Sequence, residues 1–357
     1  MEKYKEALVE LFELTISERG SDLHLKADSP PLVRVDGELV IQEDYPELSS
    51  DSIEKLVYSV LTDEQIKRFE EEMELDFSVA TPSGDRFRSN IMKERNNMGA
   101  VFRAIPTNIP NIKELGLPSQ IEEITTLKRG LVLVTGPTGS GKSTTLAALI
   151  NRINETRGAH IVTIEDPIEF IHEDKKSIIK QREVGVDTLS FNNALRHVLR
   201  QDPDVILIGE MRDIESISIA LTAAETGHLV LSTLHTQTSP TTINRIIDVF
   251  PDGRKDQIRQ QLSNTLQAIV SQQLVPSITG TGRLVAVEHL IATPAIRHLI
   301  RDKKEHQIYS SMETSKGDGM ITMDNALADL LRKGKISRRS ALEYCVDKKS
   351  FVMKMKQ

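Results

Sequence analysis

The sequence has a single cysteine and no long apolar segment. That residue, Cys345, excludes an intrachain disulfide and any zinc site built from several cysteines of one chain. The longest apolar runs have four or five residues, whereas a transmembrane helix needs roughly 20. The first residues, MEKYKEALVE, are acidic where a signal peptide has its apolar core. We therefore expect a cytoplasmic protein.

An excess of positive charge is also absent. The formal net charge is -7, whereas a surface that wraps nucleic acid is usually basic. The composition, 39% apolar and 27% charged, is ordinary for a soluble globular protein. At about 150 residues per domain, a chain of 357 residues has room for two or three domains. These numbers favour a multidomain protein that does not bind nucleic acid.

Residues 1–107 are predicted to form a small mixed α/β domain. An amphipathic helix is expected before Gly20, and the pair Asp36–Gly37 between two alternating apolar segments predicts a β-hairpin. Thr62 followed three residues later by Gln65 predicts a helix start with a capping box. Three further strands of one sheet are predicted at 76–81, 85–92 and 99–105.

Proline and glycine mark the start of a second domain. The segment PTNIPNIKELGLP, residues 106–118, contains three prolines and one glycine, so we expect a linker at 108–118. From 119 to 357, apolar strand patterns alternate with helical patterns, which predicts a mostly parallel sheet covered by helices. The expected strands are 131–135, 160–164, 205–208 and 229–233.

The strongest motif is GPTGSGKST, which fits the phosphate-loop pattern G-x-x-x-x-G-K-[ST]. It follows a predicted strand and precedes an amphipathic helix, as such a loop requires. Backbone N–H groups would surround the phosphates, Lys142 would meet the β and γ charges, and Ser143 would hold Mg²⁺. The sequence therefore predicts a site for ATP and Mg²⁺. Its candidate residues are Gly136, Pro137, Thr138, Gly139, Ser140, Gly141, Lys142, Ser143 and Thr144.

Acidic residues follow two of the predicted strands. IVTIEDPIEF carries Glu165, Asp166 and Glu169, and DVILIGEMRD carries Glu210 after Gly209, where such motors usually have aspartate. Because ligands of open α/β sheets bind at the carboxyl ends of strands, these acids should face the nucleotide. We expect Glu210 to hold Mg²⁺ through water and Glu169 to orient the attacking water, or the two to exchange roles.

Two histidines flank another predicted strand. GHLVLSTLHT places His228 before the strand and His235 after it. Without a nearby cysteine, two histidines make a poor metal site. His235 is a candidate sensor of the γ-phosphate, and the alternative for either residue is an ordinary packed or surface histidine.

Together these motifs resemble the secretion ATPase superfamily, and within it the PilT family of type IV pilus retraction motors. The likeness runs along the whole chain. GSDLHLKADSPPLVRVDGEL resembles the N-terminal module of the family, VTIEDPIEF its Asp box, LIGEMRD its Walker B segment with glycine for aspartate, and ETGHLVLSTLHT its His box. The resemblance implies an α/β fold, with a RecA-like P-loop ATPase core after a smaller N-terminal PAS-like domain.

The resemblance also assigns roles to single residues. Arg88 in FRSN and Arg103 in VFRAIP match arginines that the family uses against the nucleotide, and as arginine fingers they would neutralise charge in the transition state. The other matches are Glu169 for the Asp box, Glu210 for Walker B, and His228 and His235 for the His box.

Residues 295–302, AIRHLIRD, are similar to the AIRNLIRE motif of the retraction subgroup. His298 replaces asparagine and Asp302 replaces glutamate. Arg297 and Arg301 lie four apart on the predicted helix, where like charges repel. We therefore expect an acidic partner, on this chain or on a neighbouring subunit, with a solvated helix face as the alternative.

The resemblance implies a homohexameric ATPase that powers pilus retraction at the cytoplasmic face of the inner membrane. An inner-membrane platform protein and an accessory retraction ATPase would be its partners. The rivals within the superfamily are that accessory paralogue and the assembly ATPase, whose four-cysteine zinc motif this chain lacks. Two further rivals belong to different classes of protein, a nucleotide-gated scaffold and a DNA translocase. The complete set of site residues opposes the scaffold, and the acidic net charge opposes the translocase.

Overall fold

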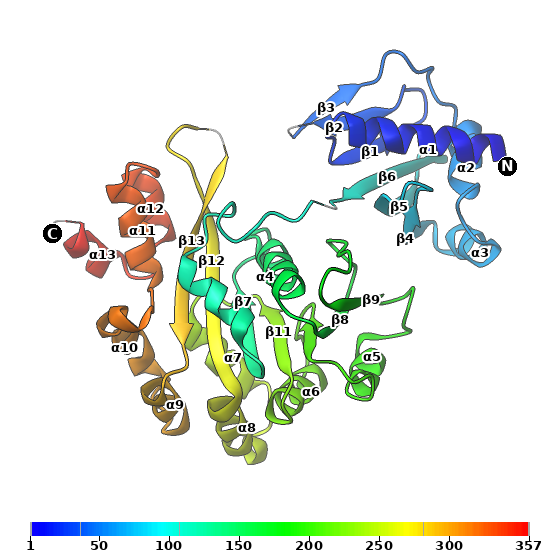
Figure 1. Ribbon diagram of the computed structural model, residues 1–357. Helices are drawn as coiled ribbons and strands as arrows, with labels where there is room; N and C mark the ends of the chain where they lie inside the picture. The colour runs from blue at the N-terminus through cyan, green and yellow to red at the C-terminus, as the bar shows by residue number, and fades with distance from the viewer. Residues whose placement is uncertain (1, 36, 107, 281, 356–357) are drawn as a thin grey trace. The chain divides into compact units, whose positions relative to one another are not determined.

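A computed structural model describes residues 2–35, 37–106, 108–280 and 282–355 (Figure 1). The chain divides into two units, Met1–Thr107 and Asn108–Gln357, each with its own sheet and apolar core. Within the described ranges, no helix has the length and apolar character that crossing a membrane requires.

The first unit is built on a six-stranded antiparallel sheet in the order β3-β2-β1-β6-β5-β4. Phe12 of the first helix lies at the centre of its core, with ring centroids 4.2 Å from Phe87 and 5.0 Å from Phe102. The elements are α1 (Glu2–Ser17), β1 (Asp22–Leu25), β2 (Leu32–Val35), β3 (Glu38–Ile41), α2 (Ser50–Tyr58), α3 (Asp63–Glu72), β4 (Glu74–Ala80), β5 (Arg86–Glu94) and β6 (Asn97–Ile105).

Most local predictions for this unit are confirmed. Thr62 and Gln65 form the expected capping box at the start of α3, with each side chain accepting from the backbone N–H of the other residue. The strands β2 and β3 pair as a hairpin, with Val35 opposite Glu38. Asp36, half of the predicted turn pair, lies outside the described residues.

The second unit contains a seven-stranded sheet in the order β13-β12-β7-β11-β10-β8-β9. Neighbouring strands are parallel except β12 and β13, which are antiparallel. The four central strands were predicted, whereas β9 and the pair β12–β13 were not. The strands are β7 (Gly130–Thr135), β8 (His160–Glu165), β9 (Ile178–Glu183), β10 (Val205–Ile208), β11 (Leu229–Leu234), β12 (Leu266–Pro276) and β13 (Arg283–Ile291).

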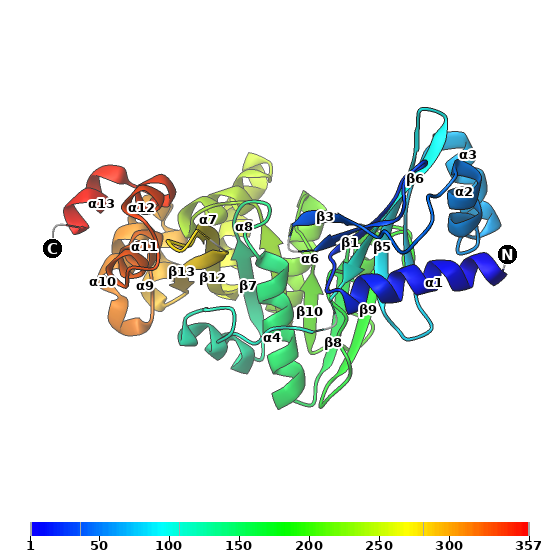
Figure 2. The same cartoon turned by 90° about the horizontal axis from the view of Figure 1, so that it is seen from above.

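Helices cover both faces of this sheet (Figures 1 and 2). On β7, Leu131 and Leu133 face one apolar layer while Val132 and Val134 face the other, so the strand is buried on both sides. The helical elements are η1 (Ser119–Thr126), α4 (Lys142–Thr156), α5 (Phe191–Val198), α6 (Ile214–Glu225), α7 (Ser239–Asp248), α8 (Asp252–Thr265), α9 (Pro294–Arg301), η2 (Glu305–Gln307), α10 (Ile308–Thr314), η3 (Lys316–Asp318), α11 (Met323–Arg332), α12 (Arg338–Tyr344) and α13 (Lys348–Lys354).

Part of the predicted linker packs on the second unit. Ile112 and Leu117 are buried in the apolar layer that also contains helix α4. Asn111 and Glu114 bond each other's backbone N–H groups at 2.9 Å, which closes a turn. From residue 111 onward the segment is therefore an ordered part of the second unit.

Candidate functional site

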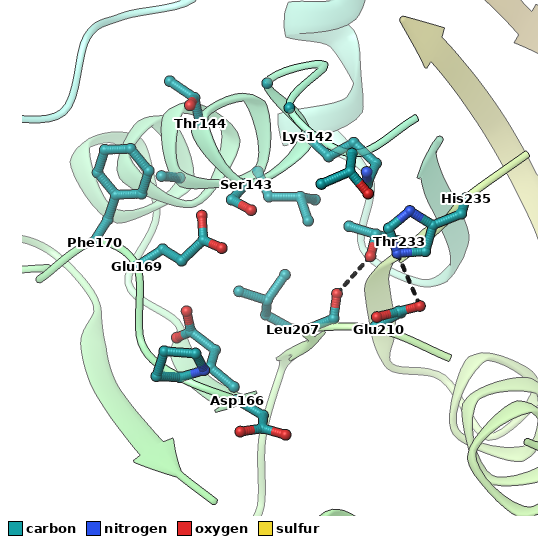
Figure 3. Close-up of a pocket in the computed structure, with 18 of the residues that line it drawn as sticks. Lys142, Ser143, Thr144, Asp166, Glu169, Phe170, Leu207, Glu210, Thr233 and His235 are labelled. Atoms are coloured by element: carbon teal, nitrogen blue, oxygen red, sulfur yellow. Dashed lines mark hydrogen bonds and ion pairs between the residues drawn. The ribbon is translucent and has the colours of Figure 1, made fainter. Parts of the chain in front are cut away.

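Several of the candidate residues follow the carboxyl ends of four neighbouring parallel strands. β7 leads into the phosphate loop, β8 to Glu169, β10 to Glu210 and β11 to His235. These segments surround a cavity of about 740 Å³, a volume typical of small-molecule sites (Figure 3). The phosphate-loop residues that line it are Thr138, Gly139, Gly141, Lys142, Ser143 and Thr144.

Glycine is required at two positions of the phosphate loop. Gly136 has φ 145° and Gly141 has φ 87°, which are backbone conformations that residues with a side chain rarely adopt. A Cβ on Gly136 would lie 2.3 Å from the backbone oxygen of Gln272, so the loop also passes too close to β12 for a side chain. Gly141 precedes the first turn of α4, whose free N–H groups and positive dipole end favour an anion.

Lys142 is a buried cation at the first position of α4. The residue is 9% exposed, and its Nζ donates to the carbonyl oxygens of Gly136 and Pro137 at 3.0 Å each. Burial lowers the pKa of the Lys142 ammonium, and the negative charges of Glu210 and Glu169 partly oppose this. An ammonium held by neutral carbonyls gains from an anion that enters the cavity.

The carboxylate of Glu210 contacts the side chains of an arginine and a histidine. Its Oε2 accepts from Arg212 Nε at 2.8 Å, and its Oε1 lies 3.0 Å from His235 Nε2 (Figure 3). The hydrogen bond to Glu210 raises the pKa of the Arg212 guanidinium. Arg212 also lines the cavity and was not predicted. It stands in the GEMRD stretch, but spacing alone does not tell which way a side chain after a strand end points.

Glu169, in the loop after β8, is exposed, whereas Glu165, the last residue of that strand, is partly buried. Glu169 is exposed on the wall of the cavity. Glu165 accepts from Thr163 Oγ1 at 2.6 Å and Gln181 Nε2 at 3.2 Å, and burial raises the pKa of its carboxyl. Gln181 Nε2 also donates to the Phe170 carbonyl at 2.8 Å, so β9 fixes the loop that presents Glu169.

Gly209 stands where most nucleotide-hydrolysing motors carry aspartate, and its surroundings disfavour a side chain. Its N–H donates to the Ile164 carbonyl at 2.9 Å. A Cβ at this position would lie 3.2 Å from that carbonyl oxygen and 3.5 Å from the Cα of Glu165. An aspartate at this position would therefore require the end of β8 to move by a few tenths of an ångström.

His228 does not belong to this cavity. It precedes β11, at the opposite end of the strand from His235, and its Nδ1 lies 3.0 Å from the Ala223 carbonyl at the end of α6. A strand of six residues spans about 20 Å, so the two histidines lie at opposite ends of β11. His228 is therefore not among the residues that line this cavity, and its role as a His-box residue stays a prediction.

Arg88 and Arg103 lie in the first unit. They are cross-strand partners on β5 and β6, and both side chains are exposed. Arg103 Nε lies 2.8 Å from Asp22 Oδ1. Their contact with a nucleotide stays a prediction.

Helix α9, which carries Arg297 and Arg301, contributes no residue to the cavity lining that the structure describes. Arg297 Nη1 donates to the carbonyls of Ser263 at 2.7 Å and Asn264 at 2.8 Å. These oxygens lie at the C-terminal end of α8, the negative end of the helix dipole. The acidic partner expected for Arg297 on this chain is therefore replaced by backbone carbonyls, while Arg301 is exposed.

The chain is similar to known proteins over almost its whole length. A model of the type II/IV secretion system protein family matches residues 16–329. The type IV pilus retraction ATPase PilT of Pseudomonas aeruginosa is 50% identical over 336 residues, which cover 94% of this chain and 97% of that protein. The type IV pilus ATPase PilU of the same organism is 42% identical over 334 residues, with 94% and 87% covered.

Solved structures agree with these relatives. A crystal structure of the pilus retraction motor PilT with bound ADP matches with a TM-score of 0.89 and 48% identity, over 96% of this chain and 98% of that one. The ATPase DotB of Legionella pneumophila matches with a TM-score of 0.76 and 27% identity, over 93% of both chains. The predicted fold, a RecA-like core with an N-terminal domain, is thereby confirmed. The chain belongs to the type II/IV secretion system protein family and, within it, to the PilT family of pilus retraction ATPases.

Proposed function

We propose that this chain is the ATP-hydrolysing motor of type IV pilus retraction. The observation that carries the proposal is the convergence of Lys142, Glu169 and Glu210 on one cavity at the carboxyl edge of a parallel sheet. The relative that is 50% identical is named a pilus retraction ATPase, and the 48% identical crystal structure contains ADP. The identity to PilU over a similar length is lower than the identity to PilT, 42% against 50%, which favours the primary motor over the accessory paralogue.

The phosphates of ATP fit the loop at residues 136–144. The glycine conformations leave no room for a Cβ at Gly136, and the loop leads into the N-terminus of α4. Lys142 would exchange its two carbonyl partners for phosphate oxygens, which carry full negative charge. Binding energy therefore comes from a buried cation and a helix end that are already in place.

Mg²⁺ fits the same cavity when the phosphates supply ligands. Ser143 and Glu210 both line it, and a hydroxyl with one carboxylate is a usual protein contribution to a magnesium site. In the described part of the chain, no cluster of three or more His, Cys, Asp or Glu side chains could hold a metal alone. Bound there, the ion would neutralise charge on the β- and γ-phosphates.

Two carboxylates divide the remaining work. Glu169 is exposed in the cavity and would orient the attacking water toward the γ-phosphorus. Glu210 is tied to Arg212 and His235, so a change at the γ-phosphate would reach the end of β11 through this carboxylate. His235 would thereby sense whether the γ-phosphate is present.

A homohexamer with arginine fingers completes the proposed motor. Arg88 and Arg103 would act on a nucleotide held by the second unit, and hydrolysis would let the first unit swing. The movement would be passed to an inner-membrane platform protein at the cytoplasmic face, with an accessory retraction ATPase as a further partner.

Phosphate release by the purified protein tests the proposal. Lys142→Ala should abolish ADP binding and turnover, and Glu210→Gln should bind ATP but hydrolyse it at least about 100-fold more slowly. Lys176→Ala, an exposed lysine outside the cavity, is the matched control and should behave as wild type. Near-normal turnover in Lys142→Ala would overturn the proposed site.

A further inference from the structure

We propose that Gln272 is a positioning residue that sets the affinity of the phosphate loop for nucleotide. It lies on β12, which pairs in parallel with β7, the strand that leads into the loop. The inference rests on the nucleotide site proposed above and adds a residue that the motif itself does not contain.

Gln272 contacts the loop at its beginning and near its end. Its backbone oxygen lies so close to Gly136 that a Cβ there would be 2.3 Å away. Its side-chain Nε2 donates to the carbonyl of Ser140 at 2.7 Å. A Cβ on Gly141 would come within 3.2 Å of the same Nε2. Gln272 of β12 therefore packs against both ends of the phosphate loop.

The bond to Ser140 fixes the direction of the next N–H group. In a planar trans peptide the C=O of one residue and the N–H of the following residue point in opposite directions. Because Gln272 holds the Ser140 carbonyl toward β12, the N–H of Gly141 points away from β12. Gly141 lines the cavity, so its N–H is held ready for a phosphate oxygen.

The hydrogen bond between Gln272 and Ser140 joins two buried residues. Gln272 is 1% exposed and Ser140 is 2% exposed, so water cannot easily replace a lost donor. Gln272 Oε1 and Ser140 Oγ have no hydrogen-bond partner among the described residues. The hydrogen bond from the Gln272 amide group therefore sets the orientation of the Ser140–Gly141 peptide on the side that faces β12.

The neighbouring Gln273 offers a matched control. Successive residues of a strand point to opposite faces, and Gln273 Nε2 is directed to the Tyr344 carbonyl, 3.5 Å away at the end of α12. It has the same side chain on the same strand without contact to the phosphate loop. Replacing either glutamine by methionine keeps the length of the side chain and removes its donor.

Binding of ADP by calorimetry, together with steady-state ATPase kinetics, tests the inference. Gln272→Met should weaken ADP binding about tenfold and raise KM for ATP by a similar factor, because one buried hydrogen bond is lost. The kcat at saturating ATP should change by less than about twofold, since Glu169 and Glu210 keep their positions. Gln273→Met should match wild type in all three quantities.

Three results would overturn the inference: wild-type ADP affinity in Gln272→Met, an equal loss in Gln273→Met, or a fall in kcat with unchanged KM. If Gln272→Met does not fold by circular dichroism, Gln272→Asn serves instead. It keeps an amide but is one methylene too short to reach Ser140, so the same result is expected. A wild-type protein that binds no ADP would overturn the proposed function itself, which separates the two failures.

Discussion

At the scale of single residues, Gly209 shows how packing decides which acid can act. The strand β10 ends against the backbone of β8, with the Gly209 N–H bonded to the Ile164 carbonyl. A Cβ there would lie 3.2 Å from the Ile164 carbonyl oxygen, so the end of β8 would have to move by a few tenths of an ångström. The carboxylates therefore come from Glu210, one residue later, and from the loop after β8.

Gly209→Asp should consequently harm the protein although it restores the usual aspartate. We expect a loss of about 1–3 kcal/mol in the free energy of unfolding, because the buried backbone of β8 must shift. Gly253→Asp is the control, since Gly253 lies in the first turn of α8 with open space around it and an acid there suits the helix dipole. Thermal unfolding and phosphate release would measure both variants, and a Gly209→Asp protein with wild-type stability would contradict the packing argument.

The sequence predicted some site residues and missed others for a physical reason. The phosphate loop, Glu169 and Glu210 follow from motifs whose backbone geometry is local. Arg212 and Gln272 contribute through tertiary contacts, and neither spacing nor composition reveals the direction of their side chains. His228 lies away from the cavity because the strand β11 separates it from His235.

At the scale of elements, burial decided which strands could be predicted. The four central strands are mostly apolar and buried because both of their faces are covered. In the edge strand β9, IIKQRE, all residues after the two isoleucines are polar or charged, and β12, LQAIVSQQLVP, carries serine and glutamines. In addition, β12 begins directly after α8, so no turn residue marks its start. These strands are fixed by pairing with distant neighbours, which a local pattern does not contain.

Helix α9 shows a second effect at this scale. Arg297 joins α9 to the end of α8 through the Ser263 and Asn264 carbonyls, whereas Arg301, one turn later, is exposed. The helix also has an apolar face, with Ile296 and Ile300 buried. The two arginines of AIRHLIRD therefore have different tasks, one within the fold and one at the surface.

Arg297→Ala should lower the free energy of unfolding by about 1–3 kcal/mol, because charge-assisted hydrogen bonds to the Ser263 and Asn264 carbonyls are lost. ATPase activity should remain substantial, since α9 is outside the cavity lining, while twitching motility should be impaired. Arg301→Ala is the matched comparison and should leave stability unchanged. Thermal unfolding, phosphate release and a motility assay distinguish these outcomes. Normal motility in Arg297→Ala would reduce the helix to a packing element.

At the scale of the whole molecule, the proposed arginine fingers would make turnover depend on both units. The cavity is built entirely from the second unit, whereas Arg88 and Arg103 belong to the first. Binding of nucleotide and its hydrolysis should therefore respond differently to changes in the first unit.

Arg88→Ala and Arg103→Ala should cut ATP hydrolysis at least about tenfold while ADP binding stays near normal. Arg103 also pairs with Asp22, so its variant needs a stability measurement beside the kinetic one. Arg68→Ala, which removes an exposed arginine paired with Glu72 on α3, is the control. If neither finger variant slowed turnover, the arginine-finger role would have to be abandoned.

The short stretch between the two units sets a limit on the stroke of such a motor. Ile105 is buried in the first unit and Ile112 in the second, and only six residues separate them. A fully extended chain of that length reaches about 25 Å from one anchor to the other. In a motor of the proposed kind, this segment limits how far the two units of one polypeptide can move apart during a catalytic cycle. Larger displacements of a pilus would therefore accumulate over many cycles.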